Sequence, residues 1–201
     1  MTPFVPPSFG AEIDRLLVGP RASREPLRLN ELGPGTPNAA MHDELEALSV
    51  ESLFQNKIVD HDMASCCLAG LWLYHDYLDE SHAISQNVET REGSYWHGIL
   101  HRREPDYGNA KYWFRRVGEH PIDDELAAAA REVARAGQTD AASQFLVDQS
   151  HWDSFRFVDL CQAAANGRSA SALVCRRIQQ REWWLLFGYC CERACSVDPL
   201  R

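Results

Sequence analysis

The chain has 201 residues and a mass of 22.8 kDa, which is the size of one domain or at most two small ones. Hydrophobic residues make up 45% and charged residues 24%, which excludes a disordered or fibrous chain. The net charge of −9 argues against a broad nucleic-acid interface. The sequence has neither a membrane-length apolar run nor the basic, apolar start of a signal peptide. These features predict a soluble, cytoplasmic protein with no nucleic-acid or membrane partner.

The seven cysteines are odd in number, and two pairs, Cys66–Cys67 and Cys190–Cys191, are direct neighbours in which a disulfide would be strained. They lie among apolar residues in helix-like segments. We therefore expect buried, free thiols in a reducing compartment.

The predicted elements begin with an irregular arm over residues 1–40, which holds most of the ten prolines and a short helix around 13–18. From Met41 onward the hydrophobic spacing is helical. Within this part, a loop is expected at 89–94, a helix is expected to end before Pro105, and Asn109 is predicted to be the N-cap of the next helix. The predicted helices cover 41–55, 58–85, 95–103, 110–117, 123–136, 140–147, 153–165 and about 169–194. The expected fold is all-α, a single-domain bundle of about six to eight helices over 41–201.

Charge and aromatic residues are unevenly distributed. Residues 42–92 hold eleven acidic and two basic residues, whereas residues 93–120 hold three acidic and five basic ones, so the two stretches are complementary if they pack together. Six aromatic residues fall within 94–114. Aromatic walls with a few polar groups are typical of a small-molecule pocket, although a core seam has the same composition. The residues predicted to bind a ligand are Tyr95, Trp96, Arg102, Asn109, Tyr112 and Trp113.

Two stretches share one spacing of metal-ligating residue types. His75, Asp79 and His82 lie at i, i+4 and i+7 of a predicted helix, and His97, His101 and Glu104 repeat that spacing on the next. Neighbouring helices usually pack together, so the two triads are expected to face each other. The predicted ligands of a divalent metal (zinc, iron or manganese) are His75, Asp79, His82, His97 and His101; the alternative is a set of hydrogen-bonded core residues.

If the site is catalytic, the chemistry favours hydrolysis, because a bound metal lowers the pKa of its water. Glu104 or Glu80 would act as general base, and Arg115 or Arg116 would neutralise the developing charge. The two arginines are equally suited to pairing with the acidic stretch. The sequence lacks the common phosphate-binding, nucleophile-elbow and HExxH motifs.

The block from Gly93 to Gly118, GSYWHGILHRREPDYGNAKYWFRRVG, resembles the signature of a family of uncharacterised bacterial and fungal proteins, as does the preceding Asp79–His82. The resemblance spans roughly residues 70–121 and implies membership of that family without an activity. Leu73–Glu80 is similar to the metal-binding helix of HD-type phosphohydrolases, particularly the guanosine-tetraphosphate hydrolases. That second resemblance implies metal ligation by His75 and Asp76, with Asp79 and Glu80 serving the attacking water and His42 or His61 as a further ligand.

The sequence thus predicts a polar, aromatic-lined internal pocket between the helix ending near His82 and the segment 95–116. The pocket is expected to bind a small polar or anionic molecule, and a metal-dependent hydrolase is the enzymatic form of this hypothesis. The alternatives are a non-catalytic binding or interaction module with a hydrogen-bonded polar core, and an HD-type phosphohydrolase. The oligomeric state stays open, a homodimer included.

Overall fold

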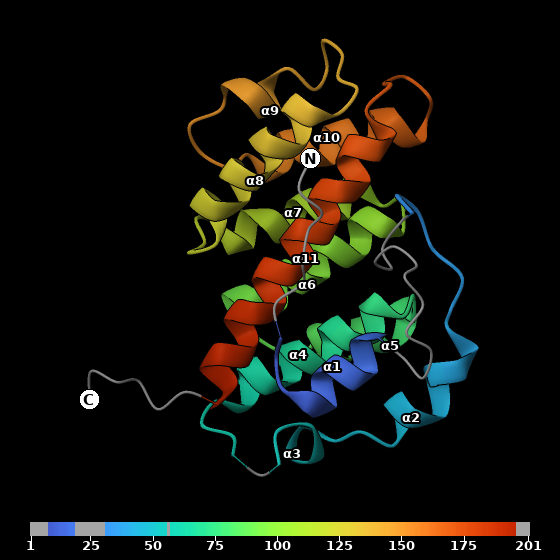
Figure 1. The fold of residues 1–201 in the computed structure, drawn as a ribbon, viewed down its shortest axis with the longest axis vertical. Helices are drawn as coiled ribbons and strands as arrows, with labels where there is room; N and C mark the ends of the chain where they lie inside the picture. Colours follow the sequence, from blue (N-terminus) through green and yellow to red (C-terminus); the bar gives the residue numbers. More distant parts are fainter. Residues whose placement is uncertain (1–7, 19–30, 56, 196–201) are drawn as a thin grey trace.

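The computed structural model describes residues 8–18, 31–55 and 57–195, and over these ranges the chain is helical without a β-strand (Figure 1). The all-α prediction is confirmed, but the described part holds eleven α-helices rather than six to eight. The prediction of one helix over 41–55 is wrong, because this stretch forms two single-turn helices, His42–Glu46 and Val50–Leu53. The predicted helix over 58–85 is also two, and the short helix of the arm completes the eleven. None of the helices in these ranges has the length and apolar character that a membrane span requires.

The elements follow each other through short connections. Their bounds are α1 Ala11–Val18, the 3₁₀ turn η1 Ala39–Met41, α2 His42–Glu46, α3 Val50–Leu53, α4 His61–Tyr74, α5 Leu78–Ser85, α6 Arg91–Arg103, α7 Tyr107–Val117, α8 Asp123–Ala136, α9 Phe145–Asp148, α10 Ser154–Ala165 and α11 Ala172–Cys195. Helices α8, α10 and α11 lie within a few residues of their predicted positions.

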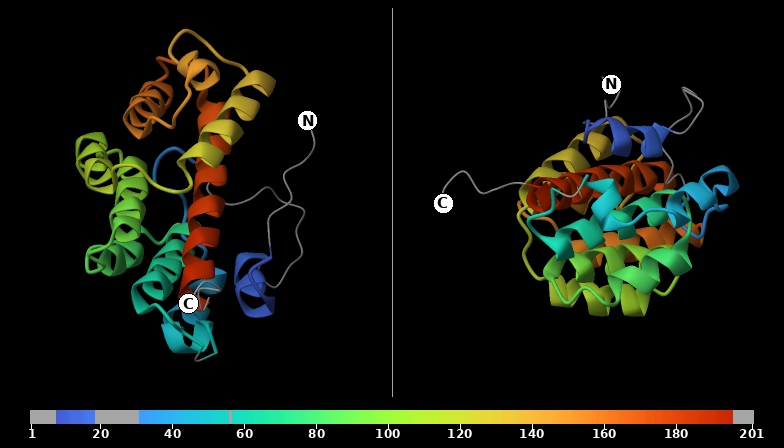
Figure 2. Two further views of the ribbon diagram at one scale, coloured as in Figure 1. Left: turned by 90° about the vertical axis from the view of Figure 1, so that its left-hand side faces the viewer. Right: turned by 90° about the horizontal axis from the view of Figure 1, so that it is seen from below.

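Helix α11 is the central helix of the described part of the chain and contacts α4, α8 and α10 along its length (Figure 2). The C-terminal half of α11 packs with α4 and α6 in a large hydrophobic core that contains Trp96, Trp183 and Phe187. The N-terminal half of α11 packs with α8 and α10 in a second core around Phe157 and Ile178. The partly buried Leu185 touches both cores, so α11 joins them.

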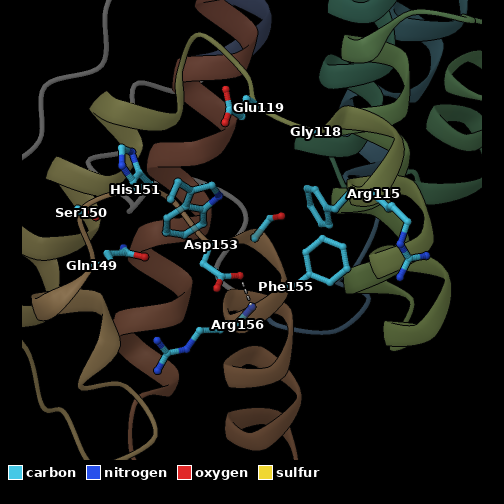
Figure 3. A pocket seen from close by; sticks show the side chains of 12 residues that line it. Arg115, Gly118, Glu119, Gln149, Ser150, His151, Asp153, Phe155 and Arg156 are labelled. Carbon is cyan, nitrogen blue, oxygen red and sulfur yellow. Dashed lines mark hydrogen bonds between the residues drawn. The ribbon is translucent and has the colours of Figure 1, made fainter.

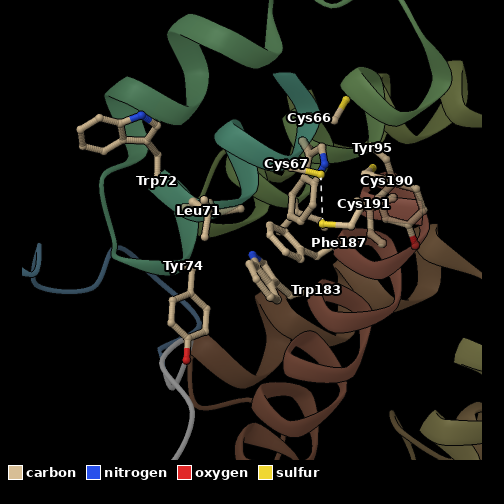
Figure 4. Packing of buried hydrophobic residues seen from close by; sticks show 14 of the residues in the cluster. Cys66, Cys67, Leu71, Trp72, Tyr74, Tyr95, Trp183, Phe187, Cys190 and Cys191 are labelled. Atoms are coloured by element: carbon tan, nitrogen blue, oxygen red, sulfur yellow. Dashed lines mark hydrogen bonds between the residues drawn. The ribbon is translucent and has the colours of Figure 1, made fainter. Parts of the chain in front are cut away.

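Four of the seven cysteines, Cys66, Cys67, Cys190 and Cys191, line the contact between α4 and α11 (Figure 4). Cys67 Sγ lies 3.3 Å from Cys191 Sγ, and the neighbouring Cys66 and Cys190 are also buried. All seven cysteines are free thiols, six of them buried and Cys195 exposed. The expectation of buried, unbridged thiols is therefore confirmed for six, and burial raises the pKa of Cys67 and Cys190, as expected of unreactive thiols.

The prediction of one helix over 58–85 is wrong, because the chain turns sharply between α4 and α5. Asp76 adopts a left-handed backbone conformation with φ of 66°. The fully buried Arg103 of α6 donates to the Asp76 carboxylate at 2.5 Å and to the Leu73 carbonyl at 3.2 Å. The ion pair and the capped carbonyl stabilise a helix end that contains neither proline nor glycine, so a distant arginine fixes a break with no local signal.

Residues 31–38 close over this corner. The Gly33 carbonyl accepts a 3.4 Å hydrogen bond from Arg103, and Asn38 N–H donates to the His75 carbonyl at 3.0 Å. Gly35 lies so close that a Cβ there would be 2.4 Å from Asp76 Cγ. The predicted helix near 13–18 is present as α1 and packs on α4, so the described parts of the arm dock on the helical body. Residues 1–7 and 19–30 of the predicted arm lie outside the described residues.

Helix α6 begins at Arg91 rather than Tyr95, so the prediction of a loop through Ser94 is wrong. Thr90 is the N-cap and accepts from Gly93 N–H at 3.1 Å. A Cβ at Gly93 would lie 2.2 Å from the Val88 carbonyl oxygen, so glycine here allows the α5–α6 turn to approach the first turn of α6.

Helix α7 also begins earlier than predicted, at Tyr107. Its N-cap is Asp106, which accepts from Asn109 N–H at 3.2 Å, rather than Asn109 itself. Asp is as good an N-cap as Asn, so the helix begins at the earlier of the two residues, three positions before Asn109. The earlier start places Asn109 inside the helix, where its side chain faces α6.

Candidate metal centre between α5 and α6

Three imidazoles gather where α5 and α6 pack together. His97 and His101 lie four residues apart on one face of α6, and His82 approaches from α5. The ring centroids are 4.5 Å apart for His82–His97, 4.7 Å for His97–His101 and 5.5 Å for His82–His101. One ring nitrogen from each residue lies within 4.8 Å of the others. Tetrahedral zinc ligands at about 2.0–2.1 Å from the metal lie about 3.3–3.4 Å apart, so a modest contraction converts this histidine group into a coordination site.

His97 is the most enclosed member of the histidine group, only 2% exposed. The Trp113 ring of α7 stacks on it at 4.0 Å, and Ser85 Oγ lies 3.4 Å from its Nδ1. Burial and the neighbouring imidazoles lower the pKa of His97 from 6.5 to about 3. The ring is therefore neutral near pH 7, which is the form that ligates metals.

His101 has polar neighbours on both ring nitrogens. Its Nε2 is 3.0 Å from Asn109 Nδ2, and its Nδ1 is 2.8 Å from a Glu104 carboxylate oxygen. Because the amide nitrogen is a donor, Nε2 accepts and the ring proton lies on Nδ1, toward Glu104. Burial lowers the pKa of His101 overall, and Glu104 opposes that shift. This carboxylate–histidine pairing is the outer-shell arrangement that orients metal-binding imidazoles.

The structure separates two of the five predicted ligands from this group. His75 ends α4 in the sharp corner, where its Nε2 lies 2.9 Å from the Leu16 carbonyl and its Nδ1 lies 3.1 Å from Asn38 Nδ2. Asp79 is exposed on the first turn of α5. The i, i+4, i+7 triad required an unbroken helix, and the break at 75–77 rotates His75 away from the face that carries His82. Asp76, a ligand under the phosphohydrolase resemblance, pairs instead with Arg103.

The residues predicted to bind a ligand fall into two sets. Tyr95, Trp96 and Arg102 are at most 1% exposed and belong to the core, where Arg102 and Tyr95 both bond the buried Glu182 of α11. Trp113 and Asn109, in contrast, contact the histidine group directly, and Tyr112 is 48% exposed beside Trp113. The aromatic block is therefore half core seam and half site wall.

The predicted catalytic residues are also divided. Glu104 contacts His101, whereas Glu80 is two residues from His82 and so lies on nearly the opposite face of α5. Arg116 is exposed, and its guanidinium lies 5.1 Å from the centroid of the Trp113 ring, which stacks on His97. Arg115 lies over Phe155 of α10 at 5.6 Å, away from that stack.

A second group with metal-ligating side chains, His42, Asp43 and Glu46, lies on the single-turn helix α2. Asp43 and Glu46 are exposed, and His42 packs its ring against Trp72 and Tyr77. Because two of its three members are exposed carboxylates, this group resembles an ordinary solvated helix face.

The structure also has a cavity of about 530 Å³ on the other side of α7, between its C-terminal end and the loop that precedes α10 (Figure 3). Its walls include Phe114, Gln149, Trp152 and Phe155. This cavity was not predicted, because Gln149 and Trp152 lie in a connection without a recognisable motif.

Comparisons of the chain with protein-family models, curated proteins and solved structures give no match. The family resemblance of the 93–118 block therefore stays a prediction, and the functional argument depends on the geometry of the site.

The low pKa of His97 predicts an acid-dependent loss of stability in the metal-free protein. Unfolding returns the imidazole to its ordinary pKa near 6.5, so the unfolded chain binds a proton that the folded protein does not bind until about pH 3. Stability is therefore fully present above pH 6.5 and falls as the pH decreases toward 3. We expect His97→Gln to flatten the dependence of the urea midpoint on pH across this range. His61→Gln, at an exposed residue, is the control; equal slopes in wild type and His97→Gln would contradict the assignment.

Proposed function

We propose that the protein is a metal-binding protein whose centre is formed by His82, His97 and His101. The observation that carries the proposal is the convergence of three imidazole nitrogens within 4.8 Å from two adjacent helices. Burial of His97 and His101 keeps their rings neutral, and Glu104 gives His101 the outer-shell carboxylate common in metal sites. An all-imidazole group is expected to bind zinc more tightly than iron, and iron more tightly than manganese, in line with the general affinity order of divalent first-row metals.

We further propose that this centre acts on a small anionic molecule by hydrolysis. Three protein ligands leave one position of a tetrahedral zinc ion for water, whose pKa then falls toward about 7. Trp113 covers His97 and limits solvent on that side. The Arg116 guanidinium lies over the Trp113 ring and has no acidic partner among the residues that the structure describes. It is therefore placed to attract a phosphate or carboxylate to the edge of the histidine group. Glu104 orients His101 in this proposal. It does not act as the general base that the sequence suggested.

A non-catalytic polar core is the second candidate. It is favoured by the hydrogen bond between Asn109 and His101, because a metal on His101 Nε2 would displace that donor. In this case the three rings form a packed aromatic group whose neutral state is fixed by burial.

Metal binding separates the two candidates. Purified protein is stripped with a chelator and titrated with Zn²⁺ against a competing indicator, and with Co²⁺ for its visible absorption bands. We expect one equivalent of tightly bound zinc and a tetrahedral Co²⁺ spectrum. His82→Gln is expected to weaken zinc binding by at least about a hundredfold through loss of one of three ligands, without unfolding the chain, because His82 is only half-buried.

Two matched variants make the result specific. His61→Gln removes an exposed imidazole and should leave the affinity unchanged. His42→Gln removes the imidazole of the exposed α2 group; if this variant, rather than His82→Gln, abolishes binding, the proposed centre is refuted. Absence of stoichiometric binding in the wild type refutes it as well and leaves the polar core.

A further inference from the structure

A single hydrogen bond joins α7 to the histidine group at the nitrogen that a metal needs. The side-chain amide of Asn109 donates to Nε2 of His101, with the two nitrogens 3.0 Å apart. The other ring nitrogen, Nδ1, lies 2.8 Å from a Glu104 carboxylate oxygen and carries the ring proton. Nε2 is therefore the nitrogen through which His101 would ligate a metal, and Asn109 occupies it.

A metal ion and the Asn109 amide exclude each other at this nitrogen. A zinc ion lies about 2.0–2.1 Å from an imidazole nitrogen and uses the same lone pair that accepts the hydrogen bond. An ion placed between two atoms 3.0 Å apart would lie only about 1 Å from the amide nitrogen. The amide must therefore turn away before His101 can ligate. Because His101 is only 6% exposed, the loss of this hydrogen bond costs free energy and lowers the affinity for the metal.

The position of α7 keeps the displaced amide beside the histidine group. The backbone N–H of Asn109 donates to the Asp106 carboxylate at 3.2 Å in the first turn of the helix. One turn further along, the Trp113 ring stacks on His97 with ring centroids 4.0 Å apart. The helix is thus held against the group at both points, and rotation about the two side-chain bonds of Asn109 is the movement that remains.

We propose that Asn109 changes partner when the metal binds: it first occupies His101 Nε2, and it then donates to a phosphate or carboxylate oxygen at the open position of the metal. This inference rests on the proposed metal centre and adds how metal binding is regulated there and how an anion is recognised. The same amide opposes binding of the metal and favours binding of the anion. Arg116 supplies charge near the site, whereas Asn109 supplies a directed hydrogen bond.

Asn109→Ala is expected to change two affinities in opposite directions. Zinc should bind at least about fivefold more tightly, because His101 Nε2 no longer loses a partner. Acetate should bind the Co²⁺-loaded protein at least about fivefold more weakly, because the donor to its oxygen is absent. Zinc is titrated against a competing indicator, and acetate is followed by the cobalt absorption bands at constant ionic strength. General damage to the site would weaken both affinities, so the opposite signs identify the two roles of the amide.

Asn166→Ala is the matched control, because Asn166 is exposed at the C-cap of α10 and should affect neither affinity. If wild type and Asn109→Ala both fail to bind zinc, the metal centre is refuted and this inference with it. If both bind zinc equally tightly, or if the variant binds acetate as well as the wild type does, the centre stands and the role of Asn109 is overturned.

A second measurement tests the first half of the proposal without a metal. Long-range ¹H–¹⁵N spectra of chelator-treated protein report which imidazole nitrogen carries a proton and whether the other one accepts a hydrogen bond. In the wild type, Nε2 of His101 should be unprotonated and hydrogen-bonded. In Asn109→Ala its ¹⁵N resonance should move toward that of a free imidazole nitrogen. An unchanged resonance would show that Asn109 does not hold this nitrogen and would overturn the proposal.

Discussion

Replacing Glu182 by leucine is expected to lower the free energy of unfolding by about 3–5 kcal/mol, the range for breaking a buried ion pair by removal of one partner. Glu182 on α11 and Arg102 on α6 form an ion pair in which both side chains are fully buried. Glu182 also accepts from the Tyr95 hydroxyl at 3.3 Å. The leucine variant leaves the guanidinium buried without a counter-charge, and urea unfolding followed by circular dichroism measures the loss.

Two further variants test the cause. The double variant Arg102→Met/Glu182→Leu should recover much of the lost stability, because an apolar pair of similar volume costs no uncompensated charge. Glu192→Leu, at an exposed position on the same helix, should change stability by less than about 0.5 kcal/mol. If Glu182→Leu behaves like Glu192→Leu, or if the double variant is as unstable as the sum of the single ones, the ion pair does not have the assigned role.

Gly93→Ala is expected to have the second largest effect and to lower the free energy of unfolding by about 3 kcal/mol, which is the upper end of the usual cost of overpacking. The new methyl group would lie 2.2 Å from the Val88 carbonyl oxygen, and a backbone atom cannot move aside as a flexible side chain can. The α5–α6 turn must therefore open. Since this turn places His82 against α6, we also expect zinc affinity to fall by about tenfold, as when the outer shell of a metal site is disturbed.

Gly108→Ala is the matched control for this variant. Gly108 lies in the first turn of α7, and a Cβ there would meet only the Asp106 carboxylate oxygen, at 3.9 Å. Alanine is the better helix former, so this change should stabilise the protein by up to about 1 kcal/mol. A neutral effect of Gly93→Ala on both stability and zinc affinity would show that the turn is not fixed by close packing.

The helices that local sequence specifies were predictable. Asp123–Ala136 is rich in alanine and ends at Gly137, and Ser154–Ala165 follows an N-cap aspartate, so propensity and capping agree with the structure. The break at Asp76 was not predictable, because it contains no residue that interrupts a helix. Arg103, 27 residues away, fixes it through a contact that only the tertiary structure creates.

The same distinction explains the candidate site. His97 and His101 lie on one continuous helix, so their shared face followed from spacing alone. His75 shared a face with His82 only if the helix continued, and the break separates them. The contact of Ser85 with His97 depends on packing between elements, which a single sequence does not specify.

The position of α11 has a consequence for the order of folding. This helix follows every other described element in the chain, yet it supplies Glu182 to Arg102, Cys191 to the Cys67 contact and the wall that joins the two cores. During synthesis, α4 and α6 leave the ribosome with their buried faces uncovered and with Arg102 lacking its counter-charge. Formation of the native core must wait until α11 has been made, so the partly synthesised chain is the state most exposed to aggregation and to chaperone binding.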